Sequence, residues 1–271
     1  MNMAAFFYEH PVFRHEEFVA WKTQQKSLKA ISINTALQHY LKEGRIISIR
    51  RGLYAVIPPN QTAETATIDT YLVAAKAATD SILAYHTALE LHGAAYSTFS
   101  KSNYLTLHKN KSFEFHNQWY QATAHPLALK KSNLTTTEVQ TINRQGLEIK
   151  ITNQERTYVD IVDRIELCGG WEEVCRALNS LLIPNVDKVI NYCLLLENDR
   201  LAAKIGYFLE QRQGAFKVSE KQLAPLLAAK PKTPQYAAKR GRDKFSLIKK
   251  WNLLLPSTVI NQSWEEPNVN I

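Results

Sequence analysis

Cysteine and long apolar runs are both scarce in this chain of 271 residues. The three cysteines, Cys168, Cys175 and Cys193, form no Cys-X-X-Cys pair, which argues against a disulfide framework and against a cysteine zinc site. No signal peptide precedes them, and charged residues interrupt every apolar stretch well before the roughly 18 residues that a membrane span needs. We therefore expect a cytoplasmic protein with no segment that crosses or binds a membrane.

Catalytic signatures are missing as well. The chain has no glycine-rich phosphate loop, no Ser-His-Asp arrangement and no candidate cysteine nucleophile. We expect no enzyme activity, no catalytic residue, no metal and no cofactor. The chain does have 45% hydrophobic residues, which are enough for folded cores. Its net charge of +8 favours an acidic partner, nucleic acid or an anionic membrane surface, and of these two we expect nucleic acid.

The composition changes at PPNQTAETAT, residues 58–67, where paired prolines precede small polar residues. Such a stretch resists both helix and sheet. It predicts a boundary between a small domain, residues 1–60, and a larger domain, residues 61–271. The small domain has eight basic and four acidic side chains, so it carries half of the net charge.

The small domain has the pattern of a winged helix-turn-helix. The segment HEEFVAW, residues 15–21, predicts a short helix with Phe18 and Val19 facing inward. The segment SINTALQHYLKEG predicts a second helix, capped by Ser32 and ended by Gly44. RIISI and LYAVI then flank RRG, which predicts a β-hairpin with arginines at its tip.

The second of these helices turns a polar face away from its apolar positions. A helix in this position lies in the major groove of DNA, while the arginines of the wing meet the backbone or the minor groove. The alternative for Arg50 and Arg51 is that they are solvated turn residues. The predicted DNA-binding residues are Ser32, Asn34, Thr35, Gln38, Lys42, Arg45, Arg50 and Arg51.

Three stretches carry a family resemblance by their order and spacing. They are RIISIRRGLYAVIP, TYLVAAKAATDSILAYHTALELHGAAYS and QERTYVDIVDRIELCGGWEEVCRAL. Over about residues 13–255, the chain resembles the AbiEi family of type IV toxin-antitoxin antitoxins and related transcriptional regulators. The resemblance implies an N-terminal domain that represses its own operon. It also implies a C-terminal domain that neutralises a nucleotidyltransferase-like toxin without a stable complex.

The chain departs from the family pattern at its start. The first helix opens with FRHEEF, which has no Ser, Thr or Asp at the expected cap. The segment before it is also short, which puts a complete three-helix module in doubt.

Residues 61–271 predict a mixed α/β region followed by helices. TIDTYLVAAKAA and ILAYHTALELHGAA have helical periods, the latter ended by Gly93, whereas NYLTLH, SFEFHNQWYQATAH and LEIKI have strand patterns. The predicted fold class is α+β, with an N-terminal winged helix-turn-helix followed by a larger mixed α/β domain with a helical C-terminal part. Further helices are predicted near 153–167, 171–182, 186–197 and 199–212. Capping boxes are predicted for Thr152 with Glu155 and for Ser219 with Gln222. A final strand is predicted over 245–256.

Helical spacing also explains several polar residues without catalysis. His86 and Glu90 share one helical face, but a zinc helix needs two histidines four residues apart. We interpret them as polar residues near a domain interface. Arg156 and Asp160 are four residues apart, as in helix salt bridges. Aromatic residues at helical spacing, including Trp171, Tyr207 and Phe208, are interpreted as core.

Glu148 and Lys150 lie on one face of a predicted strand. They form half of the carboxylate-and-lysine arrangement with which nucleases hold magnesium and orient water. The second acid would be Asp69 or Asp80, and neither lies in a convincing strand. An exposed ion pair is therefore the favoured interpretation of Glu148 and Lys150.

A second basic stretch lies at residues 230–251, KPKTPQYAAKRGRDKFSLIKKW. Its charge, with aromatic residues interleaved, suits phosphate contacts, and a solvated loop fits nearly as well. In a toxin-neutralising protein this stretch could compete for the toxin's substrate. The candidate residues are Lys239, Arg240, Arg242, Lys244, Lys249 and Lys250.

Taken together, the sequence favours a DNA-binding protein that recognises a double-stranded operator with inverted repeats, and the resemblance implies that it represses its own operon. By resemblance alone, it is also the antitoxin of an abortive-infection system that acts against a nucleotidyltransferase toxin. Two alternatives stay open. The protein could be a stand-alone transcriptional regulator without a toxin, or a nuclease-like enzyme that uses Glu148 and Lys150.

Overall fold

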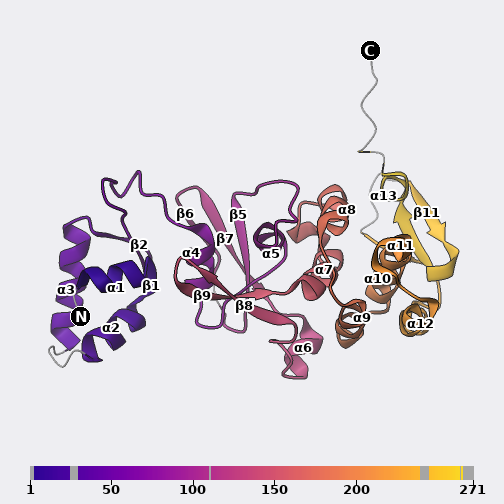
Figure 1. The fold of residues 1–271 in the computed structure, drawn as a ribbon, viewed down its shortest axis with the longest axis horizontal. Coiled ribbons are helices and arrows are strands. Elements are labelled where there is room, and N and C mark those ends of the chain that lie inside the picture. The colour runs from indigo at the N-terminus through magenta and orange to yellow at the C-terminus, as the bar shows by residue number, and fades with distance from the viewer. Residues whose placement is uncertain (1–2, 25–29, 110, 239–243, 263, 265–271) are drawn as a thin grey trace, which may run out of the picture. The chain divides into compact units, whose positions relative to one another are not determined.

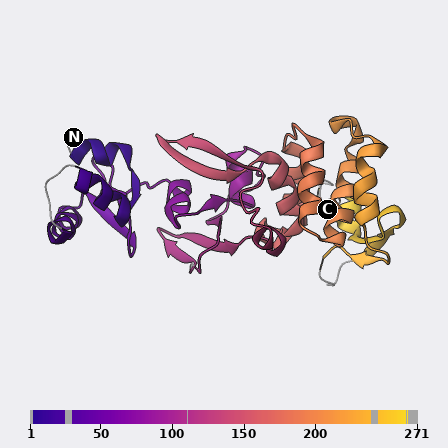
Figure 2. The same cartoon turned by 90° about the horizontal axis from the view of Figure 1, so that it is seen from below.

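The structure is a computed structural model that describes residues 3–24, 30–109, 111–238, 244–262 and 264, without the side chains of residues 30–32. Its elements are helices and strands of an α+β protein, as predicted (Figures 1 and 2). The N-terminal part is a winged helix-turn-helix. A mixed sheet and a helical C-terminal part follow it along the chain.

Three helices and a three-stranded sheet make up the winged helix. The helices are α1 (Met3–Glu9), α2 (His15–Gln24) and α3 (Ala30–Lys42), and the strands are β1 (Val12–Arg14), β2 (Ile46–Arg50) and β3 (Leu53–Val56). The strand order is β1-β3-β2, with both pairs antiparallel. Helix α1 completes the three-helix module that the short N-terminal segment had put in doubt.

Aromatic side chains from α1, β1 and α2 fill the core of the winged helix. Phe18 is fully buried, as predicted, whereas Val19 is only partly buried at the edge of the cluster. The buried members of this cluster are Phe6, Phe7, Phe13, Phe18, Ile33, Leu37 and Ile46. Helix α1 therefore supplies two of the aromatic rings on which the position of α3 depends.

The ends of α2 and α3 differ from the predicted ones in part. Helix α3 begins at Ala30, so the prediction of Ser32 as its N-cap is wrong, because the helix already includes that position. Gly44 ends the helix as predicted, with a positive φ of 66° and a backbone N–H that donates to the carbonyl oxygen of Leu41. Before α2, Glu17 supplies the second half of a capping box, since its Oε2 accepts from the backbone N–H of Arg14 at 2.7 Å, while Arg14 itself has no capping hydroxyl.

A six-stranded mixed sheet follows, with the order β6-β7-β5-β4-β9-β8. Strand β4 pairs antiparallel with β5 and parallel with β9, which confirms the predicted mixed sheet. The strands are β4 (Ile82–Leu83), β5 (Lys101–Thr106), β6 (Phe113–Phe115), β7 (Gln118–Ala124), β8 (Val139–Arg144) and β9 (Leu147–Thr152), with helix α4 (Thr70–Lys76) before them and α6 (Leu127–Lys131) between β7 and β8.

The segment ILAYHTALELHGAA is not one helix. It forms strand β4 and then helix α5 (His86–Leu91), which are separated by Tyr85 with a φ of 58°. A non-glycine residue in this region interrupts a right-handed helix, so the helical period of the apolar residues was misleading here. Gly93 ends α5 with a φ of 68°, as predicted.

The helical C-terminal part agrees closely with the predicted helices. They are α7 (Gln154–Asp163), α8 (Trp171–Ser180), α9 (Val186–Leu195), α10 (Asp199–Gln211), α11 (Gln213–Phe216) and α12 (Glu220–Ala229), with a 3-10 turn η1 (Ile165–Leu167) after α7. Tyr207 and Phe208 are buried, and the half-buried Trp171 packs on Phe208 at 6.1 Å between ring centroids.

Only one of the two predicted capping boxes forms. Ser219 and Gln222 cap α12 reciprocally, as predicted. The cap of α7 is instead Asn153, whose side chain accepts from the N–H of Arg156 at 2.9 Å. Thr152 is the last residue of β9, and its hydroxyl bonds Thr157, so it is not available as a cap.

The predicted final strand over 245–256 is a β-hairpin. It consists of β11 (Phe245–Ile248), the 3-10 turn η2 (Lys249–Trp251) and β12 (Leu253–Pro256), and β10 (Gln235–Tyr236) pairs in parallel with β12. Asn252 has a φ of 49°, which turns the chain back between the two strands. Trp251 is fully buried and donates from Nε1 to Glu210 at 2.7 Å. A short helix α13 (Ser257–Asn261) follows.

The contacts divide the chain into two units. One contains Met1–Leu83, Ser100–Thr123 and Thr141–Ile151, and the other contains Ala84–Phe99, Ala124–Gln140 and Thr152–Ile271. The predicted domain boundary at residue 60 stays a prediction. All three cysteines are buried, and none of them forms a disulfide with another described cysteine. Among the described residues, no helix is long and apolar enough to cross a membrane.

Candidate nucleic-acid interface

The outward face of α3 is the first part of the candidate interface. Ile33 and Leu37 are buried, at 3% and 2% exposure, and they fix the rotation of the helix. The exposed side chains on the other side are Asn34, Thr35, Gln38, His39 and Lys42. The sequence therefore placed the polar face of this helix correctly, because helical spacing relates the buried and exposed positions directly. The side chain of Ser32 lies outside the described residues.

Asn34 and His39 have partners within the winged helix. His15 Nε2 and Asn34 Oδ1 share a hydrogen bond of 2.8 Å, which ties α3 to the start of α2. His39 Nε2 lies 3.0 Å from Glu43 Oε1, one turn further along α3. The structure records no bonded partner for Gln38 or Lys42 among the residues it describes. An amide and an ammonium group thus face outward on consecutive turns.

Arg45 lies beyond α3, at the start of the hairpin. Its guanidinium stands over the rings of Phe7 and Tyr40, at 5.1 and 5.3 Å from their centroids. The residue is exposed, so its charge stays in solvent while its planar group packs on the aromatic pair. Arg45 accordingly belongs to the α1 side of the winged helix.

Arg50 and Arg51 differ sharply, although they are adjacent at the hairpin tip. Arg50 donates to the carbonyl oxygens of Ala77 and, at 3.4 Å, Lys111, and its guanidinium lies 4.4 Å from the ring centroid of Phe113. Arg51 is exposed, and the described part of the chain offers it no recorded partner. The interpretation of both as solvated turn residues is therefore wrong for Arg50, because its partners lie far along the chain.

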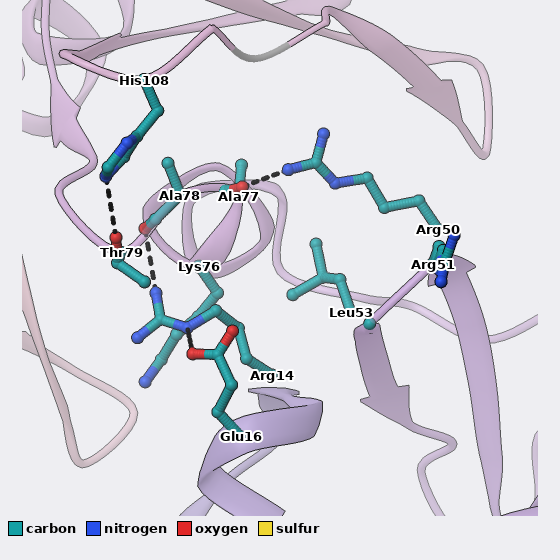
Figure 3. Close-up of a pocket in the computed structure, with 11 residues that line it drawn as sticks. Arg14, Glu16, Arg50, Arg51, Leu53, Lys76, Ala77, Ala78, Thr79 and His108 are labelled. Carbon is teal, nitrogen blue, oxygen red and sulfur yellow. Dashed lines mark hydrogen bonds and ion pairs between the residues drawn. The ribbon is translucent and has the colours of Figure 1, made fainter.

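A pocket of about 220 Å³ lies beside the hairpin tip and the end of α4, and we call it the wing pocket (Figure 3). Arg14 reaches into it from β1 and donates from Nη1 to the carbonyl of Ala78 at 2.9 Å. Elsewhere in the lining of the pocket, Thr79 Oγ1 lies 3.3 Å from His108 Nε2. The lining residues are Arg14, Glu16, Arg50, Arg51, Gly52, Leu53, Lys76, Ala77, Ala78, Thr79 and His108.

Sequence reasoning did not find three of the basic residues of this pocket. Arg14, Lys76 and His108 are spread over more than 90 positions of the chain and carried no signal beyond their residue types. The contacts of α4 with β1 and with β5 bring them together, and these pairings of elements have no local pattern in the sequence. Of the predicted residues, only Arg50 and Arg51 line the pocket.

The second basic patch is described only in part. Lys239, Arg240 and Arg242 lie outside the described residues, while Lys244 and Lys249 are exposed. Lys250 forms ion pairs with Glu210 and, at 3.6 Å, Glu220. The hydrogen bond to Glu210 raises the pKa of Lys250. Lys250 thus has two acidic partners within the chain, and its place in the second basic patch stays a prediction.

The proposed nuclease arrangement gains no second acid. Glu148 and Lys150 are both exposed on β9, and no ion pair joins them in the described structure. Asp69 caps α4 and binds Arg144 Nε at 2.7 Å. Asp80 accepts from Thr106 and from the N–H of Leu107, and these bonds outweigh burial and lower its pKa. Among the described residues, no group of three or more His, Cys, Asp or Glu side chains is arranged so that it could hold a metal ion.

His86 is a buried structural residue. Its ring lies 3.5 Å from Glu90 and 3.3 Å from Glu173 and stacks on Phe99 at 3.7 Å between centroids. Glu173 also accepts from the N–H groups of Tyr96 and Ser97. The sequence indicated Glu90 as a neighbour but could not indicate Glu173, which lies 87 positions from His86.

Comparisons with known proteins support the fold. No protein-family model and no curated protein sequence matches this chain. Among solved structures, the chain is similar to the crystal structure of the RV2827C protein from Mycobacterium tuberculosis, with a TM-score of 0.56 and 14% identity. The match covers 94% of this chain and 90% of that one. At this identity, the likeness shows that the two proteins share a fold along almost their whole length.

Proposed function

We propose that the protein is a DNA-binding transcriptional repressor that autoregulates its own operon. The observation that carries the proposal is the exposed polar face of α3 on a winged helix-turn-helix. In this fold the corresponding helix enters the major groove, which is wide enough for a helix and presents a distinct pattern of donors and acceptors for each base pair.

Gln38 and Lys42 have different parts in this proposal. The amide of Gln38 can pair with the N6 and N7 groups of adenine, and so it reads sequence. Lys42, one turn later, contacts a phosphate and adds affinity without sequence preference. The hydrogen bond from His15 orients the amide of Asn34, which leaves its nitrogen to donate to a base.

The wing arginines are also assigned separate parts. Arg51 is exposed and meets the DNA backbone or minor groove. Arg50 holds the hairpin tip through Ala77, Lys111 and Phe113. The proposal therefore keeps Arg51 as a DNA contact and gives Arg50 a positioning role.

The direct test is binding of the purified full chain to its own upstream DNA and to unrelated DNA of equal length. We expect tighter binding to the upstream DNA, and Gln38→Ala should reduce that preference by about 1–3 kcal/mol. The matched control is Gln140→Ala, which removes an exposed glutamine from β8. Equal affinity for both DNAs, unchanged by Gln38→Ala, would contradict the proposal.

We further propose, on the sequence resemblance to the AbiEi family, that the protein neutralises a nucleotidyltransferase-like toxin without a stable complex. Co-expression with the product of a neighbouring nucleotidyltransferase gene tests this part. Restored growth supports the antitoxin role. Toxicity that persists, or the lack of such a gene, leaves a stand-alone regulator.

A further inference from the structure

The wing pocket concentrates positive charge. Arg14, Arg50, Arg51 and Lys76 line it, and Glu16 is the one acidic residue in its lining. His108 adds an imidazole that can donate a hydrogen bond. Because the pocket is a concave surface of low-dielectric protein, these charges act together on an anion that enters it.

Several donors in the pocket are not saturated. Arg14 Nε is buried and forms no hydrogen bond with any residue that the structure describes, and it lies 3.7 Å from Glu16 Oε2, which is beyond hydrogen-bond distance. The guanidinium of Arg51 has no recorded partner in the described part of the chain. The two arginines together offer more N–H groups than the protein uses.

The negative groups beside the pocket are already engaged. Glu17 pairs with Lys76 and lies 3.9 Å from Arg14 Nη2. Asp80 accepts from Thr106 and Leu107. The carbonyls of Ala77 and Ala78 at the end of α4 accept from Arg50 and Arg14, so the negative end of that helix is covered.

We propose that the wing pocket binds a phosphate group, from the DNA backbone or from a small phosphorylated molecule. Forked guanidinium groups match the geometry of phosphate oxygens, and the mixture of arginines with one lysine is typical of such sites. The volume of about 220 Å³ is smaller than pockets for drug-sized ligands, so it suits a phosphate or diphosphate better than a whole nucleotide. The site does not depend on whether α3 reads DNA.

Calorimetric titration of the full chain with pyrophosphate tests the site, against sodium chloride of equal ionic strength. We expect one pyrophosphate per chain. Arg51→Ala should weaken binding about tenfold, because it removes a charge-assisted contact, and Glu16→Gln should strengthen it about threefold, because it removes the acid in the lining. Arg200→Ala removes an exposed arginine from α10 and serves as the matched control, with no expected change.

Competition with DNA then identifies the source of the phosphate. Displacement of pyrophosphate by the upstream duplex assigns the pocket to the DNA backbone, and simultaneous binding assigns it to a free phosphorylated molecule. The proposal is overturned if pyrophosphate does not bind, or if it binds equally to wild type, Arg51→Ala and Glu16→Gln. DNA binding that persists in that case leaves the proposed repressor function intact.

Discussion

Arg50 donates a hydrogen bond to the carbonyl oxygen of Ala77, the residue at the C-terminal end of α4. Arg14 donates to the next carbonyl, that of Ala78, at 2.9 Å. The last carbonyls of a helix lack partners within the helix, and cations there also interact favourably with the helix dipole. The winged helix is thus joined to α4 by two arginines that satisfy consecutive carbonyls.

This relationship predicts unequal effects of two adjacent substitutions on stability. Arg50→Ala should lower the free energy of unfolding by about 1–2 kcal/mol, because it leaves the carbonyls of Ala77 and Lys111 without their charged donor. Arg51→Ala should change it by less than about 0.5 kcal/mol, since an exposed side chain is lost. Urea unfolding of both variants measures the difference, and equal destabilisation would show that the contacts of Arg50 contribute nothing.

Salt dependence separates phosphate contacts from base contacts. Lys42→Ala and Arg51→Ala should each lower the slope of log affinity against log salt by about 1, whereas Gln38→Ala should leave the slope unchanged. Anisotropy titrations with upstream DNA at several salt concentrations provide the slopes. A slope that stays at the wild-type value in both charge variants would remove these two residues from the interface.

The packing of Trp251 on Gly206 predicts a strong effect of one methyl group. A Cβ at position 206 would overlap the indole ring of Trp251, which is fully buried. Gly206→Ala should therefore destabilise the protein by about 1–3 kcal/mol through overpacking. Gly214→Ala is the control, since a Cβ there meets no atom within 4 Å and the residue lies in the helix α11. The control should be neutral or slightly stabilising in thermal unfolding.

Lys204 predicts a pH dependence of stability. Burial lowers its pKa from 10.5 to about 8, and its Nζ donates to the carbonyl of Val162. The unfolded chain binds the proton of the Lys204 ammonium more tightly than the folded chain does. The free energy of unfolding therefore rises with pH between about pH 8 and pH 10.5, and below about pH 8 this increase is absent. From pH 8 to pH 10 the free energy of unfolding of wild type should rise by about 2 kcal/mol relative to Lys204→Met. Parallel curves for the two proteins would contradict the lowered pKa.

The sequence predicted those parts of the fold that depend on local pattern. Ile33 and Leu37 recur at helical spacing, and Gly44 ends the helix, so α3 and its outward face followed from residues within a few turns. The mixed sheet and the helices of the C-terminal part were predicted for the same reason. The prediction of one helix over ILAYHTALELHGAA was wrong, because the positive φ of Tyr85 has no signal in the composition of the segment.

The candidate site was predictable only in its local part. Gln38 and Lys42 face outward as helical geometry requires. The contact of Arg50 with Ala77 and the approach of Arg14 to Ala78 depend on how α4 packs on β1, which no short-range pattern encodes. For that reason the sequence predicted the same kind of site for both arginines of RRG, whereas in the structure Arg50 contacts Ala77, Lys111 and Phe113 and Arg51 is exposed.

Recognition of a specific operator by α3 can be tested by footprinting the upstream DNA with the full chain. We expect protected half-sites whose centres lie about 10–10.5 base pairs apart, or a multiple of that, with protection lost in Gln38→Ala at a concentration that saturates wild type. Uniform protection along the DNA, or none at concentrations that also bind unrelated DNA, would contradict it.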